Sequence, residues 1–194
     1  MKTANVYILL FDGFSDWEIA YLTPELNKSE KSTVKFFTVH APEVTSMGGL
    51  RVRSDLLLEQ LGIEAVSALV LPGGTAWEKN EIAGIDALVE QLNAANKTIA
   101  AICAATTFLG QRGYLDHIGH TSNDLNYLKA AAPHYKGEKK YKNIPAITDG
   151  NIITANGTAP QEFARELFIK LNIYDQKEAE KWFQLFKHGI WTEE

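Results

Sequence analysis

Cysteine is almost absent from this sequence: Cys103 is the one cysteine among 194 residues. A lone cysteine cannot form an internal disulfide. The apolar run at Asn5–Phe11 is also short and meets Asp12-Gly13 at once, so it suits neither a signal segment nor a membrane span. These absences predict a cytoplasmic protein with no membrane partner. Any chemistry of Cys103 is then that of a free thiol.

Basic clusters and nucleotide-binding motifs are missing as well. The net charge is −5, the pI is near 5.6, and the only group of closely spaced lysines lies at 136–142. No P-loop or G-x-G-x-x-G motif occurs. His117 and His120 have no cysteine or carboxylate placed to complete a metal site. We therefore expect no nucleic acid partner, no metal and no cofactor, but a small neutral or polar ligand.

The sequence does contain a regular series of apolar segments. Its length and its content of 45% hydrophobic and 22% charged residues suit one globular domain over residues 1–194. Continuous apolar runs predict buried strands at 5–11, 33–39, 65–71 and 98–102. A turn at 48–49 leads into another short strand, and 120–123 is a weaker strand candidate. Asp149-Gly150 is a strong hairpin signal between two further strands.

Helical patterns separate most of these strands. The S-x-x-E spacing at Ser15–Glu18 is typical of a capping box, and Pro24 is expected to kink or end the helix that follows. Further helices are predicted at about 82–92, 104–109 and 124–132. This alternation of strands and helices predicts a three-layer α/β sandwich.

Two more capping patterns mark the carboxyl-terminal part of the chain. Thr158-x-x-Gln161 and Asp175-x-x-Glu178 are each expected to open a helix. The second helix belongs to an extension at 174–194 that carries several aromatic side chains. We expect these aromatic residues to pack on the core or on a dimer partner; they are Trp182, Phe183, Phe186 and Trp191.

Three loops follow predicted strands and are candidates for a binding site. They are Asp12–Glu18, Pro72–Thr75 and Cys103-Ala104, and ligands of open α/β sheets bind at the carboxyl ends of strands. A thiol at this turn faces free helix amides, which favour a thiolate and can bind an oxyanion. Each residue also has a purely structural interpretation. Cys103 can be a small buried hydrophobe, Glu18 a helix cap and Gly73-Gly74 a turn with positive φ.

Four segments together resemble the ThiJ/PfpI family of the class I glutamine amidotransferase-like superfamily. They are Phe11–Glu18, Val70–Gly74, Ala100–Ala104 and Gly150–Gly157, and the likeness runs from about residue 4 to 172. The resemblance implies a flavodoxin-like three-layer α/β/α sandwich with a mostly parallel sheet and a nucleophile elbow. It also implies a homodimer.

The resemblance assigns roles to particular residues. Cys103 matches the reactive cysteine of the family, and Glu18 matches the carboxylic acid that hydrogen-bonds its sulfur in many members. Gly74 and Ala104 match the positions whose backbone amides form the oxyanion site. Such amides stabilise an oxyanion whatever their side chains are.

The chain departs from the family where a histidine is expected. The stretch that commonly ends in histidine ends here in Asn123, and the position after the cysteine, a histidine in protease-like members, is Ala104. Asn123 can only donate or accept hydrogen bonds. Glu18 is then the best candidate for the acid and base of the reaction, because a desolvated carboxyl group has a raised pKa. His120 is a weaker candidate for reaching the pocket.

Three functions remain open on the sequence. The first is a cysteine-dependent hydrolase-like enzyme, amidase/protease-like or glyoxalase-like, in which Cys103 attacks a small carbonyl or amide substrate. The second is a redox-responsive protein of oxidative stress whose cysteine becomes a sulfinate that Glu18 hydrogen-bonds. The third is a non-catalytic member of the fold with a structural cysteine.

Overall fold

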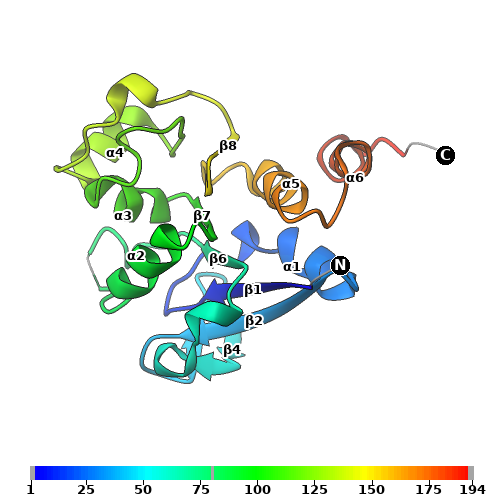
Figure 1. Cartoon of the computed structure of the whole chain (residues 1–194), viewed down its shortest axis with the longest axis horizontal. Helices are drawn as coiled ribbons and strands as arrows, with labels where there is room; N and C mark the ends of the chain where they lie inside the picture. The colour runs from blue at the N-terminus through cyan, green and yellow to red at the C-terminus, as the bar shows by residue number, and fades with distance from the viewer. Residues whose placement is uncertain (1–2, 80, 192–194) are drawn as a thin grey trace.

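A seven-stranded sheet with the order β5-β2-β1-β6-β7-β9-β8 forms the centre of this computed structural model, which describes residues 3–79 and 81–191 (Figure 1). Neighbouring strands are parallel except for β8 and β9. Buried apolar residues fill β1, β6 and β7 because helices cover both faces of the sheet. The strands are β1 (Ala4–Leu9), β2 (Ser32–Thr38), β5 (Leu56–Leu57), β6 (Ala68–Leu71), β7 (Thr98–Ile102), β8 (Ala146–Asp149) and β9 (Ile152–Ala155).

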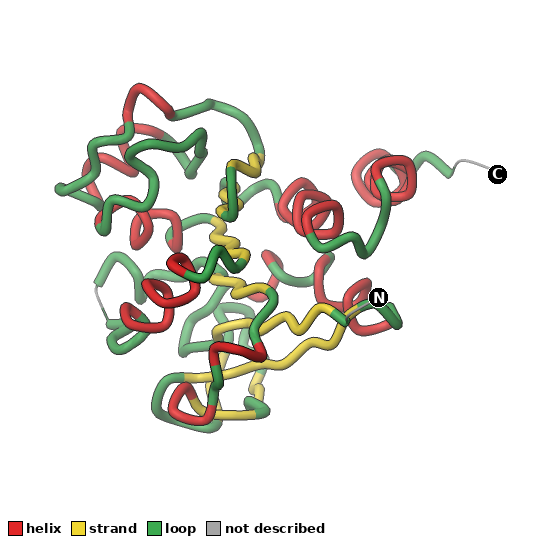
Figure 2. The backbone as a smooth tube through the Cα atoms, viewed as in Figure 1, coloured by secondary structure: helices red, strands yellow, loops and turns green. Residues whose placement is uncertain are grey.

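The helices form two layers, one on each side of the sheet, as Figures 1 and 2 show. One layer holds α1 (Leu22–Lys28), α5 (Pro160–Lys170) and α6 (Gln176–His188), with α5 packed on both of the others. The other holds α2 (Asp86–Ala94), α3 (Ala105–Gln111) and α4 (Leu125–Ala131). The result is the predicted flavodoxin-like sandwich. Within the described residues, no helix is long and apolar enough to cross a membrane.

Short elements complete the fold. A separate antiparallel pair, β3 (Glu43–Thr45) and β4 (Arg51–Arg53), lies before β5. The described residues also form 3-10 helices in loops: η1 (Asp16–Glu18), η2 (Leu58–Gln60), η3 (Ile63–Ala65) and η4 (Glu138–Lys140).

Several local predictions are confirmed. The strand β7 has the predicted bounds, and Asp149-Gly150 closes the β8–β9 hairpin. Asp124 caps α4 by accepting the N–H groups of Asn126 and Tyr127. Asp175 and Glu178 form both hydrogen bonds of the predicted capping box at α6. In each case the signal depends on neighbours within the segment itself.

Other local predictions are wrong. The Ser15 side chain makes no cap hydrogen bond. The Ser15 N–H donates to Gly73 O, and the Glu18 carboxylate accepts the Gly73 N–H instead of the Ser15 N–H. Pro24 neither kinks nor ends a helix; it lies in the first turn of α1, where its missing N–H costs nothing. Ala159 rather than Thr158 is the N-cap of α5. Residues 120–123 form no strand, since His120 makes only an isolated bridge to Tyr141.

The predicted extension at 174–194 contains the helix α6. Its last residues, 192–194, lie outside the described residues. Residues 1–2 of the predicted domain lie outside them as well. Trp182 and Phe183 are buried, and Trp182 packs edge-on against Phe168 of α5 at 5.0 Å between ring centroids. Phe186 is 44% and Trp191 76% exposed. The first two aromatic residues therefore pack on the core as expected, and the other two remain largely on the surface.

Candidate active site

Cys103 follows β7 directly and has a backbone φ of 59°. This left-handed conformation costs about 1–2 kcal/mol for a residue with a Cβ, so hydrogen bonds must hold it. The Cys103 N–H donates to Ala155 O at 2.9 Å, and the buried Thr106 hydroxyl donates to Cys103 O at 2.6 Å. The residue therefore stands on a strained strand-to-helix turn, which is the geometry of a nucleophile elbow.

The Glu18 side chain reaches this turn from η1, the segment that follows β1. It is fully buried, and Oε2 accepts the Gly73 N–H at 2.6 Å. Its other oxygen, Oε1, has no hydrogen-bond partner by distance and angle within the described chain. A Cβ placed on Gly157 would stand 2.7 Å from Cys103 Sγ and 3.3 Å from Glu18 Oε1. The free oxygen and the sulfur therefore face the same small space.

Burial changes the acidity of both groups. It raises the pKa of the Glu18 carboxyl to about 7, although the Gly73 N–H, the Cys103 thiol and the Ser15 hydroxyl act in the opposite direction. Burial and the negative charge of Glu18 raise the pKa of the Cys103 thiol to about 12. The expected effect of helix amides on the thiolate is thus outweighed by desolvation. Between these two pKa values the pair holds one proton.

Asn123 contacts the sulfur from the loop before α4. Its Nδ2 donates to Cys103 Sγ at 3.3 Å, and its Oδ1 accepts the Gly157 N–H at 2.8 Å. Because Gly157 N–H can only donate, the amide must turn its NH₂ group toward the sulfur. This contact lowers the pKa of the thiol against the larger effect of burial.

A cavity of about 130 Å³, which we call the cysteine cavity, is lined by Cys103, Gly74, Ala104 and Asn123 together with several rim residues. The Gly74 N–H makes no hydrogen bond with any residue that the structure describes. Gly74 has a φ of 146°, and a Cβ there would stand 2.7 Å from Gly13 O. Only glycine fits this position, where it leaves a free N–H donor beside the thiol.

Trp17 lies in the predicted loop Asp12–Glu18 and lines the cysteine cavity. Three other lining residues, Met47, Glu78 and Tyr127, lie outside the predicted loops and were not identified from the sequence. Trp17 Nε1 donates to Gly157 O at 3.3 Å, and the Tyr127 hydroxyl donates to Glu78 Oε1 at 2.7 Å. Trp17 is adjacent to Glu18 in the sequence, but the others come from separate loops and α4, and no local pattern links them to Cys103.

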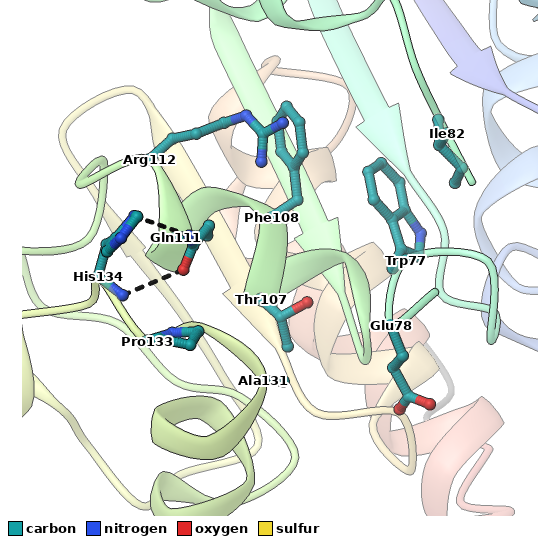
Figure 3. Close-up of a pocket in the computed structure, with 10 residues that line it drawn as sticks. All are labelled: Trp77, Glu78, Ile82, Thr107, Phe108, Gln111, Arg112, Ala131, Pro133 and His134. Carbon is teal, nitrogen blue, oxygen red and sulfur yellow. Dashed lines mark hydrogen bonds between the residues drawn. The ribbon is translucent and has the colours of Figure 1, made fainter. Parts of the chain in front are cut away.

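A larger cavity of about 510 Å³ also has Glu78 in its lining (Figure 3). Trp77 and Phe108 form its aromatic wall, with ring centroids 5.2 Å apart. Gln111 and His134, which hydrogen-bond each other at 2.8 Å, lie farther along it. The Thr107 hydroxyl is in its lining but donates to Ala104 O at 2.7 Å. We therefore take the cysteine cavity as the candidate active site.

The structure does not bring His120 to the thiol. The ring is fully buried, Nδ1 lies 2.8 Å from Ile118 O and Nε2 lies 2.6 Å from the Tyr135 hydroxyl. A carbonyl can only accept, so Nδ1 carries the proton and Nε2 accepts. Burial also lowers the pKa of this imidazole. His120 is thus a neutral core residue outside the cysteine cavity.

Comparison with known proteins gives consistent matches. A model of the DJ-1/PfpI family matches residues 4–170. A Bacillus subtilis protein named uncharacterized protease YoaZ is 38% identical, over 96% of this chain and 92% of that protein. A Thermococcus kodakarensis deglycase is 33% identical over 57% of this chain and 67% of its own length. The crystal structure of a DJ-1 superfamily protein from Agrobacterium tumefaciens has a TM-score of 0.89 at 36% identity, covering 96% of this chain and 99% of that chain.

Proposed function

This chain belongs to the DJ-1/PfpI family, and we propose that it is a cysteine-dependent hydrolase-like or glyoxalase-like enzyme acting on a small carbonyl or amide substrate. One observation carries the proposal: the Cys103 sulfur lies at a strained turn, faces an open cavity and shares its surroundings with a buried carboxyl group. The names of two relatives, a protease and a deglycase, are in keeping with it.

In the first step, sulfur attacks the carbonyl carbon while its proton moves to Glu18. The thiol holds its proton more tightly than the carboxyl does. The S–H bond therefore breaks only as the C–S bond forms. Glu18 Oε1, which has no other partner within the described chain, is the oxygen that receives the proton.

Negative charge then develops on the former carbonyl oxygen. The N–H groups of Gly74 and Ala104 are the proposed donors, since both residues line the cysteine cavity and the Gly74 N–H makes no other contact with the described chain. Fixed donors of this kind stabilise an oxyanion without reorganisation during the reaction. Asn123 keeps the sulfur in place and moves no proton.

The second step depends on the substrate. With an amide, the Glu18 carboxylic acid returns its proton to the leaving nitrogen, and water then hydrolyses the thioester at sulfur. With a 2-oxoaldehyde, addition of sulfur gives a hemithioacetal whose oxyanion takes up the proton. A proton shift between its two carbons then gives a 2-hydroxy thioester, and water hydrolyses this thioester and frees the thiol. A cavity of about 130 Å³ suits the small substrate that the sequence predicts. No feature of the described residues favours the alternative of a redox-responsive protein without turnover.

A substrate panel tests the proposal. Hydrolysis of small activated amides and esters and consumption of methylglyoxal are measured for wild type, Cys103→Ala and Glu18→Gln. We expect turnover to fall at least about a thousandfold in Cys103→Ala and about a hundredfold in Glu18→Gln. Glu81→Gln changes a carboxylate outside the cysteine cavity and serves as the matched control. Turnover that survives in Cys103→Ala refutes the mechanism.

A further inference from the structure

Glu78 lines both the cysteine cavity and the larger cavity, and it is the one residue that their linings have in common among the described residues. A molecule that reacts at Cys103 and extends beyond the small cavity toward the larger one therefore passes this carboxylate. The Tyr127 hydroxyl holds Glu78 Oε1 at 2.7 Å. Glu78 is exposed, and this hydrogen bond holds its side chain where the linings of the two cavities meet.

The charge of Glu78 is not balanced locally. Within residues 3–79 and 81–191, no lysine, arginine or histidine forms a salt bridge with it. The lining of the cysteine cavity contains no basic side chain either. The Tyr127 hydroxyl that binds Glu78 is also within range of the Cys103 thiol and the Glu18 carboxyl, and both of these groups add negative charge when they ionise. The potential around the Glu78 carboxylate is therefore negative.

The far part of the larger cavity does not reverse this potential. The Arg112 guanidinium stacks on Phe108, 3.8 Å from the ring centroid, and forms a salt bridge with Asp86. The positive charge of Arg112 is thus paired with the carboxylate of Asp86. Trp77 and Phe108, 7% and 5% exposed, offer aromatic surface between Arg112 and Glu78 (Figure 3). Aromatic rings tolerate a nearby cation and attract it when it lies over their faces.

We infer that Glu78 is a specificity-determining residue that selects substrates with a positively charged nitrogen, an ammonium or a guanidinium, beside the reacting carbonyl. The cation pairs with the free side of the Glu78 carboxylate, and the remainder of the molecule has the larger cavity available. Anionic substrates are repelled at the same point. The inference rests on the proposed function only for the identity of the reacting group.

The lone cysteine makes a direct test possible, because a thiol reagent can modify only Cys103. Two methanethiosulfonates of similar size are compared, one with a trimethylammonium group and one with a sulfonate. In each case the sulfur of Cys103 forms a disulfide with the reagent, and methanesulfinate leaves. The ratio of the two rates, measured by intact mass, cancels the thiolate fraction and reports the charge that the reagent meets.

We expect the cationic reagent to react faster with wild type, and Glu78→Gln to lower the rate ratio about tenfold. Tyr127→Phe should lower it less, since the carboxylate remains but loses its anchor. Salt should reduce the wild-type ratio. Glu81 is exposed like Glu78 and lies on the same loop, but it is outside both cavities, so Glu81→Gln should leave the ratio unchanged.

A ratio that Glu78→Gln does not alter, or that Glu81→Gln lowers as much, overturns the inference. Modification of the thiol requires no turnover. If the enzyme assays fail while the charge ratio behaves as expected, the proposed function is refuted and the charge selection at Cys103 stands. If turnover depends on Cys103 but the ratio does not depend on Glu78, the proposed function stands and the charge selection by Glu78 is refuted.

Discussion

Glu18 shows how one side chain can serve folding and chemistry in opposite ways. Its buried carboxyl group has a pKa of about 7, against 4.5 in an exposed setting, and desolvation is the main cause. Folding therefore favours the protonated form, whereas the proposed reaction needs the carboxylate to receive the thiol proton. The two demands meet near neutral pH, where both forms of Glu18 are populated.

This conflict predicts a pH-dependent stability. Because the folded pKa of Glu18 is raised, the folded state binds more protons than the unfolded state between pH 4.5 and 7. Stability from the protonated carboxyl is complete below pH 4.5 and is lost as pH rises through 7, by about 3 kcal/mol. Glu18→Gln should remove this loss, so its stability relative to wild type should increase from pH 4 to pH 8.

Denaturant unfolding of both proteins across this range measures the effect. Cys103→Ala is a suitable comparison, because it removes the sulfur but leaves the carboxyl group buried, so its pH dependence should resemble that of wild type. Parallel curves for wild type and Glu18→Gln would show that the carboxyl group titrates normally in the folded protein.

Gly157 gives a second prediction for a single residue. A Cβ at this position would stand 2.7 Å from Cys103 Sγ and 3.0 Å from Cys103 Cβ. Gly157→Ala should therefore displace the sulfur, lower stability by about 1–3 kcal/mol and reduce turnover about a hundredfold.

The matched control is Gly62→Ala, whose Cβ would meet no atom within 4 Å. It should leave turnover unchanged. Neither glycine has a positive φ, so the comparison isolates the contact with the sulfur. Equal turnover in the two variants would show that the sulfur has room to move.

The sequence predicts the site residues that lie at the ends of strands but not the ones that complete the cavity. Cys103 directly follows one apolar run, and Gly74 closely follows another. The family likeness adds Glu18. Glu78 and Tyr127 have no such signal, because their proximity to Cys103 depends on how two loops and α4 pack. The position of His120 could not be predicted for the same reason, because it depends on contacts with Tyr135 and Ile118 that hold the ring in the core.

Among the elements, three similar capping patterns have different outcomes. Asp175-x-x-Glu178 forms a complete capping box, whereas Ser15 makes no cap hydrogen bond and Thr158 bonds Asn156 instead. The spacing of residues is similar in each, so it cannot separate these outcomes. At Glu18, the buried Gly73 N–H offers the carboxylate a partner from another loop, and this tertiary contact replaces the local one.

This difference predicts unequal effects of removing the caps. Asp175→Ala should lower stability by about 1 kcal/mol and increase hydrogen exchange in the first turn of α6. Thr158→Ala removes an exposed hydroxyl that caps no helix and should change stability by less than about 0.5 kcal/mol. Denaturant unfolding with hydrogen exchange compares the two. Equal losses would mean that Thr158 contributes to α5 despite its geometry.

For the whole molecule, the sequence predicts the number and type of the strands better than it predicts their order in the sheet. Continuous apolar runs predict buried parallel strands, and Asp149-Gly150 predicts the antiparallel pair. The position of β1 between β2 and β6 depends on crossover connections, and no local sequence pattern predicts these. The strand β6 is also shorter than the apolar run at 65–71, because η3 ends at Ala65 and Val66-Ser67 connect it to the strand.

The homodimer implied by the family likeness stays a prediction. Sedimentation velocity should give a species of twice the 21.6 kDa of one chain. The exposed Phe186 and Trp191 of the extension and the exposed Trp17 and Met47 beside the cysteine cavity are apolar side chains available for such contact. A monomer at micromolar concentration would contradict the prediction.

Glu18, Gly73 and Cys103 follow three strands, β1, β6 and β7, that are neighbours in the sheet but distant in the chain. A form in which β1 is not folded onto β6 and β7 therefore lacks Glu18 beside Cys103, and no partly folded form of this kind has the complete site. In a destabilised variant, each molecule should be either folded and fully active or unfolded and inactive. In such variants the measured rate should follow the fraction of folded protein, while the rate per folded molecule stays constant.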